Sequence, residues 1–460
     1  MFFKDEKIYV NDSDAHGINI APTGGGKSRA SARLLIDSIK KSRAKESAVI
    51  CDPKGELYKS TAGDLKEYGI DCVLINFRDP DRSDGWNPLE ASYVYYEKGQ
   101  TNKAEQSIDS VAQALMSCVS YNRDPFWSKG SELYMGSNIK MILPYVPSLD
   151  YYNLRNIIPL CTESALSTVS IISKETKQPE SVLNGLRILT ENQASGTRSG
   201  LFATIQTGLG ELVRNEALLR LLSRKSISLS DVGKKPIFVY IIYPDERESM
   251  DFAVRLFIRQ IYQALCDVCE TQKNDRLPVR VNYIMDEFSN LAKIDGFENM
   301  ISESRSKNQR FFLFVQAMEM LESKYDKTTA ATILSNASDW VCFSSKEIGF
   351  LKYLSELTGD YIDYKGRRKP LLSPSDMQYL RKGDKSVEVV ILRQGVRPYV
   401  TKLPFYDCTN LPNPNYQEPG LPRKVTANSK YILSEYDWMT KITSGEYPYH
   451  PPGEKRKKPK

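Results

Sequence analysis

Apolar and polar positions follow two different periods along this chain of 460 residues. Up to residue 92, short apolar runs alternate with segments in which apolar residues recur at every third or fourth position. The runs predict strands at 17–21, 47–52 and 72–76, and the periodic segments predict helices at 27–42 and 56–68. Strands that alternate with helices in this way usually pair in parallel. The beginning of the chain therefore predicts a parallel sheet flanked by helices.

The pattern changes at residue 93 and returns near residue 226. Strand-like runs nearly vanish between these positions, where apolar residues keep the helical spacing. Further along, strands are predicted at 237–242, 281–285, 311–315, 340–343, 387–392 and 398–402, with a helix over 250–269. The predicted fold class is α/β, with a mainly parallel sheet and an inserted all-α domain.

Four segments follow from these changes of pattern. Residues 1–92 and 226–408 form two pieces of one α/β domain, and residues 93–225 form the inserted all-α domain. Residues 409–460 are rich in proline and end in a basic run at 455–460. We expect this C-terminal tail to pack loosely or to be disordered.

A glycine-rich loop joins the first predicted strand to the first predicted helix. From Ala21 to Ser28 it reads A-P-T-G-G-G-K-S, which matches the phosphate-binding pattern G-x-x-x-x-G-K-[ST] except that alanine takes the place of the first glycine. Glycines let successive N–H groups turn toward a phosphate, Lys27 reaches the β- and γ-phosphates, and the Ser28 hydroxyl ligates Mg²⁺. The alternative is a glycine-rich turn before an ordinary helix. The loop predicts that ATP and Mg²⁺ bind at Thr23, Gly24, Gly25, Gly26, Lys27 and Ser28.

An acidic pair ends the predicted strand at 281–285. Four of the five residues before the pair are apolar, which suits a strand buried on both faces. At this position Asp286 would hold the Mg²⁺ shell, and Glu287 would polarise the attacking water. Taken alone, an apolar run that ends in Asp-Glu is also an ordinary edge between a strand and a loop. Together with the glycine-rich loop, the pair predicts an ATPase.

Two further side chains have candidate roles in hydrolysis. Arg305 ends a predicted helix, and in ring-shaped ATPases an arginine of one subunit reaches the γ-phosphate of its neighbour. A surface arginine paired with a carboxylate such as Glu303 is the alternative. Gln316 directly follows the predicted strand at 311–315, where its amide would sense the γ-phosphate; a capping glutamine is the alternative.

The segment from Asp52 to Glu56 lies at the carboxyl end of the second predicted strand, the edge of an open α/β sheet where ligands bind. Its charged side chains could face the nucleotide or the next subunit. Asp-Pro and Lys-Gly are also plain turn formers, so the sequence leaves both readings open.

Composition adds little to this picture. With 41% hydrophobic and 26% charged residues, the chain resembles an ordinary folded protein, and its net charge of +6 allows a nucleic-acid partner without arguing for one. No apolar segment approaches the roughly 18 to 20 residues of a membrane-spanning helix, and no signal peptide opens the chain. We therefore predict a cytoplasmic protein. If relatives carry an N-terminal membrane anchor, this chain has lost it or obtains it from a partner.

Several motifs occur in a consistent order from Ala21 to Pro374. They are the loop at 21–28, the segments 52–56, 78–80, 86–89, 124–127, 286–291 and 302–306, Gln316, and the segment 371–374. As a set they resemble the conjugative coupling proteins, the type IV secretion ATPases that bring a relaxase-bound DNA strand to the export channel. Two features depart from the family: Ala21 replaces a glycine, and the membrane anchor is missing, so the chain is either a soluble variant or a truncated one.

The resemblance implies a RecA-like P-loop NTPase with an all-α domain that assembles as a homohexamer around a channel for DNA. It implies that Arg305 is the family's trans-acting finger and that Gln316 is its coupling glutamine. The implied partners are single-stranded, relaxase-bound DNA, the relaxase and the components of the secretion channel. Membrane contact would come through a partner subunit, which would place the protein at the inner face of the cell membrane.

Two other functions remain open at this point. One is a protein adaptor, in which ATP acts as an assembly switch for recruiting a relaxase or an effector with little DNA pumping. The other is a chromosome-partition or DNA-packaging pump that shares the same core. Against this pump stand the tryptophan motifs and the helical insertion.

Overall fold

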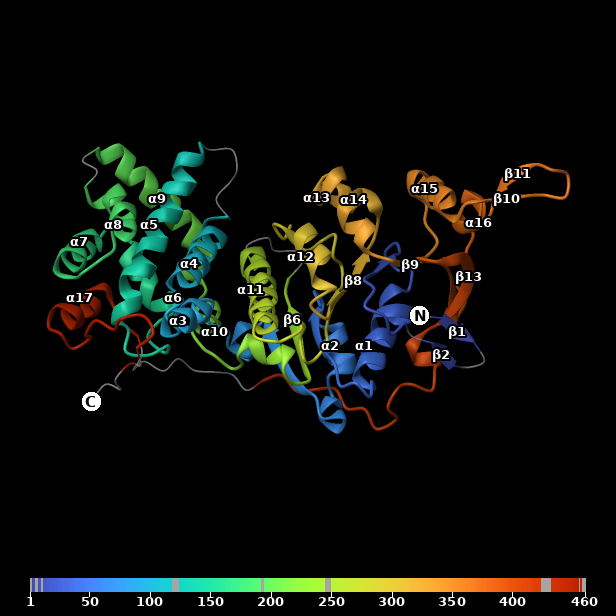
Figure 1. Ribbon diagram of the computed structural model, residues 1–460, viewed down its shortest axis with the longest axis horizontal. Coiled ribbons are helices and arrows are strands. Elements are labelled where there is room, and N and C mark those ends of the chain that lie inside the picture. Colours follow the sequence, from blue (N-terminus) through green and yellow to red (C-terminus); the bar gives the residue numbers. More distant parts are fainter. Residues whose placement is uncertain are drawn as a thin grey trace. The chain divides into compact units, whose positions relative to one another are not determined.

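The computed structural model describes residues 2–4, 7–9, 11–117, 124–191, 194–244, 250–422, 432–454 and 456. The chain forms two compact units, each made of three separate segments (Figure 1). Unit 1 contains Met1–Leu74, Leu229–Glu246 and Tyr262–Gly420. Unit 2 contains Ile75–Ser228, Arg247–Ile261 and Leu421–Lys460. The first segment of unit 2 thus runs from residue 75 to residue 228, whereas the sequence pattern predicts a helical domain over 93–225.

The described part of the chain contains a sheet of nine strands in the order β13-β12-β9-β3-β8-β7-β4-β6-β5. These strands are β3 (Gly17–Ile20), β4 (Ser47–Cys51), β5 (Asp71–Asn76), β6 (Ile237–Ile242), β7 (Val281–Met285), β8 (Gln309–Val315), β9 (Asp339–Cys342), β12 (Ser386–Arg393) and β13 (Val396–Pro404). The pairs from β9 through β3, β8, β7 and β4 to β6 are parallel, whereas β12 pairs antiparallel with both β9 and β13. The prediction of an α/β fold with a mainly parallel sheet is confirmed.

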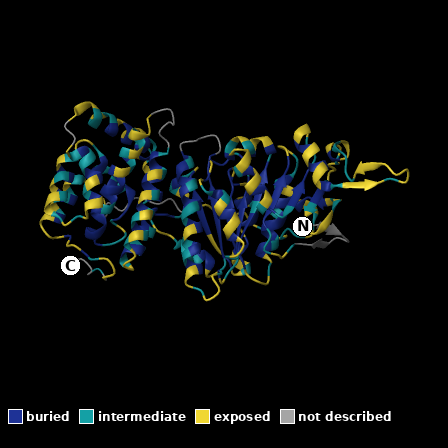
Figure 2. Ribbon diagram, turned by 45° about the horizontal axis from the view of Figure 1, so that its top comes forward, coloured by how far each residue is buried: buried dark blue, intermediate teal, exposed yellow. Residues whose placement is uncertain are grey.

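The central strands are buried on both faces. Every residue of β3, β4, β6 and β7 is buried, and these strands appear dark blue in Figure 2. Continuous apolar runs are what a parallel sheet covered by helices requires. The helices of unit 1 include α1 (Arg33–Lys40), α2 (Glu56–Thr61), α12 (Phe297–Ser304), α13 (Met318–Tyr325), α14 (Lys327–Asn336), α15 (Ile348–Thr358) and α16 (Pro374–Gln378).

Two small antiparallel pairs complete unit 1. The first pairs β1 (Phe2–Lys4) with β2 (Lys7–Tyr9). The second is a hairpin of β10 (Asp360–Ile362) and β11 (Arg368–Pro370) between α15 and α16. Neither pair was predicted from the sequence, because each strand is only three residues long.

Apart from the end of β5, the regular structure in the described residues of unit 2 is helical, as the sequence pattern predicts for 93–225. Its helices are α3 (Glu90–Glu97), α4 (Thr101–Met116), α5 (Pro125–Ile142), α6 (Leu154–Ile157), α7 (Leu166–Glu175), α8 (Glu180–Thr190), α9 (Ser195–Arg214), α10 (Glu216–Leu221) and α17 (Glu435–Thr443). Helix α11 (Asp251–Glu270) begins in unit 2 and ends in unit 1. No helix of the described residues is both long and apolar enough to cross a membrane.

The C-terminal segment is not a loose tail, and this expectation was wrong. Helix α17 packs into unit 2 with the Trp438 ring fully buried, and the indole Nε1 donates a hydrogen bond to the Asn156 carbonyl at 2.8 Å. A buried tryptophan outweighs the disorder that the surrounding prolines suggest, because it removes a large apolar area from water. Most of the predicted basic run at 455–460 lies outside the described residues.

Trp438→Ala is expected to destabilise unit 2 by about 3–5 kcal/mol, because it leaves a cavity and an unpaired carbonyl. Phe and Leu replacements should be milder, in that order, since they fill more of the site. Calorimetric unfolding of the three variants measures this effect, with the exposed Tyr436→Ala on the same helix as the control. Equal unfolding temperatures for Trp438→Ala and wild type would show that α17 does not contribute to the folded unit.

Candidate nucleotide-binding site

Four neighbouring strands of unit 1 bring the candidate side chains to one edge of the sheet. Strands β3, β8, β7 and β4 are adjacent and parallel, with Ile20 opposite Val315 and Cys51 opposite Met285. The residues that follow these strands therefore leave the sheet at its carboxyl edge, which is where ligands bind in open α/β sheets. They are Ala21, Gln316, Asp286 and Asp52.

The glycine-rich loop has the backbone shape that a phosphate requires. Gly24 and Gly26 have φ values of +73° and +93°, and a Cβ on Gly25 would lie 2.9 Å from the Pro22 carbonyl oxygen. Ala21 is buried and has no positive φ, so alanine fits where the usual pattern has glycine. The following helix starts as a π-helical turn, η1 (Ser28–Ala32), and continues as α1.

Several N–H groups of this loop are left for a ligand. In the part of the chain that the structure describes, no backbone acceptor lies within reach of the N–H groups of Gly24, Gly26, Lys27 or Ser28. Unsatisfied N–H groups at a helix start attract anions, and the helix dipole adds to the attraction. The loop is therefore suited to a phosphate chain.

Gly26→Ala is expected to weaken nucleotide binding at least tenfold. A Cβ at this position would lie 2.9 Å from Cε1 of Phe405, and the positive φ adds about 1–2 kcal/mol of backbone strain. Gly24→Ala has similar strain but no atom within 4 Å, so it should lose less affinity. Titration with a fluorescent ATP analogue compares the two, with Gly349→Ala as the unstrained control. Equal losses at both loop positions would exclude a role for the contact with Phe405.

Lys27 is joined to the acidic strand end through Glu287. The Lys27 Nζ lies 2.8 Å from Oε2 of Glu287, and the same oxygen accepts a hydrogen bond of 2.6 Å from Nε2 of Gln316. The Oε1 of Gln316 in turn accepts from the Thr23 hydroxyl at 3.0 Å. Four predicted residues thus form one continuous network between the loop and the ends of β7 and β8.

The backbone at Glu287 is strained. Its φ is +52°, in the left-handed region, which is uncommon for a residue with a long side chain. The next residue returns to the sheet, since the Phe288 N–H donates to the Phe314 carbonyl at 2.8 Å. Strain of this kind costs about 1–3 kcal/mol and persists where the surroundings fix it. Here it accompanies a side chain that meets both Lys27 and Gln316.

Two buried carboxyl groups, those of Asp286 and Asp52, lie near this network. Burial raises the pKa of Asp286 to about 6; the Lys27 ammonium opposes this rise, and the Glu287 carboxylate adds to it. Burial also raises the pKa of Asp52 to about 7, against the hydrogen bond from the Tyr58 N–H, and the charge of Asp286 adds to the rise. Each carboxyl is thus held near a second negative charge, an arrangement that favours binding of a cation.

The donor set at this edge fits Mg²⁺ and a nucleoside triphosphate. The Ser28 hydroxyl starts η1, and the Asp286 carboxylate ends β7 with Oδ1 accepting from the Glu287 N–H at 3.1 Å. Oxygen ligands of this kind are those that Mg²⁺ prefers, with phosphate oxygens and waters completing its shell. Asp52 instead binds within its own chain, because its Oδ2 accepts from the Tyr58 N–H at 2.8 Å at the start of α2.

Arg305 does not join this cluster. It follows α12 on the surface, and β8 begins only at Gln309, so it lies at the amino edge of the sheet. The seven residues of β8 span about 23 Å between the two edges at 3.3 Å per residue. Arg305 therefore cannot serve the loop of its own chain. Glu303, the surface partner suggested for Arg305, pairs instead with Lys307 at 3.1 Å.

Sequence reasoning missed three side chains around the loop. The Lys382 Nζ donates to the Gly24 carbonyl at 2.6 Å, and Asp407 pairs with Arg29 at 2.7 Å. The Arg29 guanidinium also lies 4.5 Å from the centre of the Phe405 ring. The three missed residues are Lys382, Asp407 and Phe405. They come from the C-terminal part of unit 1, far from the loop in the sequence, and no local motif marks them.

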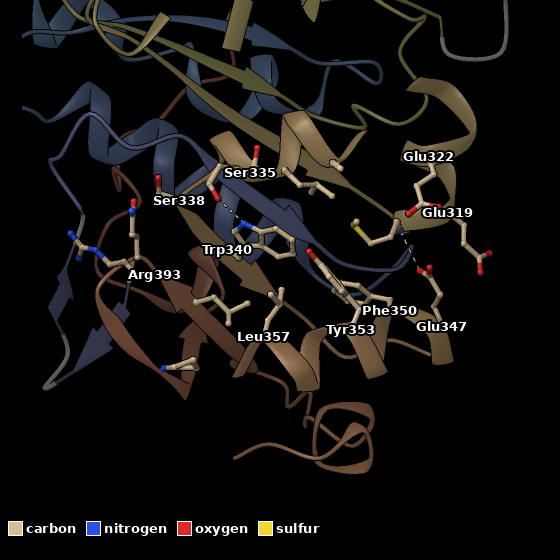
Figure 3. A pocket seen from close by; sticks show the side chains of 18 of the residues that line it. Glu319, Glu322, Ser335, Ser338, Trp340, Glu347, Phe350, Tyr353, Leu357 and Arg393 are labelled. Atoms are coloured by element: carbon tan, nitrogen blue, oxygen red, sulfur yellow. Dashed lines mark hydrogen bonds between the residues drawn. The ribbon is translucent and has the colours of Figure 1, made fainter. Parts of the chain in front are cut away.

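A separate pocket of about 810 Å³ lies elsewhere in unit 1 (Figure 3). The figure shows an aromatic and aliphatic middle, formed by Trp340, Phe350, Tyr353 and Leu357, with Glu319, Glu322 and Glu347 toward one end and Arg393 toward the other. None of its lining residues belongs to the loop or to the acidic strand end. The pocket is therefore distinct from the candidate nucleotide site.

The sheet, the loop and the acidic strand end define a RecA-like P-loop fold. The family model for type IV secretory system conjugative DNA transfer matches residues 2–365, which is most of the chain. The chain belongs to this family, which confirms the resemblance inferred from the motifs.

Known relatives agree with this assignment. The chain is 21% identical over 423 residues to protein VirD4 of Rhizobium rhizogenes, covering 86% of this chain and 59% of that protein. It is 24% identical over 408 residues to the conjugal transfer protein TraG of Escherichia coli, covering 80% of this chain and 60% of TraG. The chain thus spans about three-fifths of the length of the curated relatives it matches.

Solved structures of the plasmid coupling protein TrwB share the fold. The complex of TrwB with the non-hydrolysable ATP analogue ADPNP gives a TM-score of 0.58 at 16% identity, over 92% of this chain and 89% of that chain. The complex of TrwB with ADP and Mg²⁺ gives 0.57 at 15% identity, with the same coverage of 92% and 89%.

Proposed function

We propose that this chain is the ATP-hydrolysing motor of a conjugative coupling protein, which recruits relaxase-bound DNA to a type IV secretion channel and drives its transfer. The observation that carries the proposal is the network of Thr23, Lys27, Glu287 and Gln316 at the carboxyl edge of the sheet. Family membership and the nucleotides in the TrwB complexes support ATP and Mg²⁺ as its ligands.

The residues divide the work of hydrolysis. The loop N–H groups and Lys27 hold the phosphates, and Ser28 and Asp286 supply oxygen ligands. Bound Mg²⁺ would neutralise charge on the phosphate chain. Lys27 exchanges Glu287 for phosphate oxygens, which frees the Glu287 carboxylate to accept a proton from the attacking water. Gln316 contacts both the loop and Glu287, so it is placed to report the state of the site to the rest of unit 1.

The DNA partner, the relaxase, the channel components and the homohexamer belong to the proposal. The position of Arg305 is compatible with a ring, because an arginine at the edge opposite to its own loop is free to reach the site of another subunit. We further propose that membrane contact comes through a partner subunit and that the protein works at the inner face of the membrane.

Steady-state ATP hydrolysis, with and without single- and double-stranded DNA, tests the proposal across a range of protein concentrations. Stimulation by DNA that steepens with protein concentration is the expected result, since each ring site needs two subunits. Hydrolysis that is indifferent to DNA would contradict a translocase. It would favour an adaptor that uses ATP as a switch, because an adaptor has no reason to hydrolyse faster on DNA.

A further inference from the structure

The β10–β11 hairpin projects from the rest of unit 1 (Figures 1 and 2). Its sequence places aromatic residues at and just before the turn. Tyr364, in the turn, has 91% of its surface exposed, and Ile362 and Tyr361 before it have 75% and 43%. Large exposed apolar side chains that gather in one place usually mark a contact surface.

Hydrogen bonds within the turn fix the backbone that carries Tyr364. The Asp363 N–H donates to the Arg367 carbonyl at 2.9 Å, and Gly366 has a φ of +75°, as in three-residue hairpin loops that close with a glycine bulge. The Asp363 carboxylate accepts from the N–H groups of Lys365 and Arg367, both at 2.9 Å. Although the loop is exposed, the polar groups at its base are hydrogen-bonded, so the ordered backbone keeps Tyr364 at the tip of the hairpin.

The hairpin is also cationic. It has four basic and two acidic side chains, and three of the basic ones are paired: Arg368 with Asp360 at 2.5 Å, and Arg367 and Lys369 with Asp363 at 3.0 and 3.5 Å. Lys365 has no carboxylate partner among the described residues, and its Nζ lies 5.5 Å from the centre of the Tyr364 ring. An unpaired ammonium thus sits beside the most exposed ring.

We infer that this hairpin contacts single-stranded DNA, with Tyr364 stacking on a base and Lys365 meeting the adjacent phosphate. The inference rests on the proposed function and names a DNA contact for it. Aromatic rings interleaved with cations are the usual surface for unpaired nucleotides, because every base has a face that can stack. A ring of subunits would present one such tip from each.

The arrangement favours DNA over a lipid surface. Across the strands, Tyr361 lies opposite Lys369 and Ile362 lies opposite Arg368. Each apolar side chain therefore has a cation as its nearest cross-strand neighbour, and neither face of the hairpin is an apolar surface that could enter a membrane.

Binding of a fluorescein-labelled mixed-sequence oligonucleotide, measured by anisotropy on the full chain, tests this inference. Tyr364→Ala should lower the affinity for the oligonucleotide about fivefold or more, because one base stack is lost. Tyr364→Phe should retain the wild-type affinity. Lys365→Gln should lower the slope of log affinity against log salt concentration by about 0.7, the value for one phosphate contact to a single strand. Tyr436→Ala, an exposed tyrosine of unit 2, is the matched control and should change nothing.

The outcomes separate this inference from the function on which it rests. Wild-type protein that binds DNA, together with a Tyr364→Ala protein of equal affinity and unfolding temperature, would overturn the hairpin contact alone. Wild-type protein that neither binds DNA nor hydrolyses ATP faster on it would overturn both. Binding to phosphatidylglycerol vesicles that is lost in Tyr364→Ala, with DNA binding unchanged, would replace DNA by lipid. Crosslinking of a 5-bromodeoxyuridine oligonucleotide to Tyr361 or Tyr364 would support the inference directly.

Discussion

Glu287→Gln protein is expected to bind ATP normally and to hydrolyse it about 10²–10⁴-fold more slowly than wild type. The amide keeps the size of the side chain and can still meet Gln316, but it cannot take a proton from water. In the wild-type protein, one carboxylate oxygen of Glu287 lies 2.8 Å from the Lys27 Nζ and 2.6 Å from the Gln316 Nε2. The carboxylate is therefore already at the site. Single-turnover hydrolysis and the nucleotide recovered from the purified protein measure the two effects.

Glu303→Gln is the control for this change, because Glu303 is exposed on α12 and, among the described residues, forms its ion pair with Lys307. It should hydrolyse ATP at the wild-type rate. A wild-type rate for Glu287→Gln itself would show that Glu287 is not the base, and Asp286 or a bound water would then have to polarise the nucleophile.

Arg305→Ala protein is expected to lose about 10³–10⁵-fold in turnover while it keeps its affinity for nucleotide. The guanidinium is exposed and has no hydrogen-bond or ion-pair partner among the described residues, so its loss should leave the fold intact. Lys307→Ala, two residues further on, removes a nearby cation and should have little effect. Hydrolysis assays of both variants, at concentrations where wild type assembles, compare them.

Mixing two inactive variants tests whether Arg305 acts on a neighbouring subunit. Lys27→Ala subunits have the arginine but no working loop, and Arg305→Ala subunits have the loop but no arginine. Where an Arg305→Ala subunit supplies the loop and a Lys27→Ala subunit supplies the arginine, the interface has a complete site. Activity should therefore appear at intermediate mixing ratios. If no mixing ratio restored ATP hydrolysis, the result would count against an arginine that acts in trans.

Strand ends could be predicted well, because the signals for them are local. The apolar runs before Ala21, Asp286 and Gln316 fixed where each strand leaves the sheet, and parallel pairing then placed their polar ends together. The hydrogen bonds among Thr23, Gln316 and Glu287 follow from this placement. The roles of these residues in hydrolysis stay predictions.

Contacts made by distant segments could not be predicted. Nothing near Lys382 or Phe405 in the sequence indicates the loop at 21–28, and the positive φ of Glu287 depends on the packing around β7 and β8. One missed element did have a local signal. Ser434 and Asp437 form a capping box at the start of α17, a spacing that marks a helix start inside the segment expected to be loose.

The place of β3 in the sheet has a consequence during synthesis. Its register pairs Gly17 with Phe312 on β8 and with Asp339 on β9, so both of its neighbours are translated long after it. At about 5–20 residues per second, a ribosome needs roughly 15–60 s to supply the first of them. During this interval β3 has no neighbouring strand to pair with. The nascent chain therefore exposes an unpaired strand edge until β8 is made, which is the kind of surface that aggregates or that holding chaperones bind.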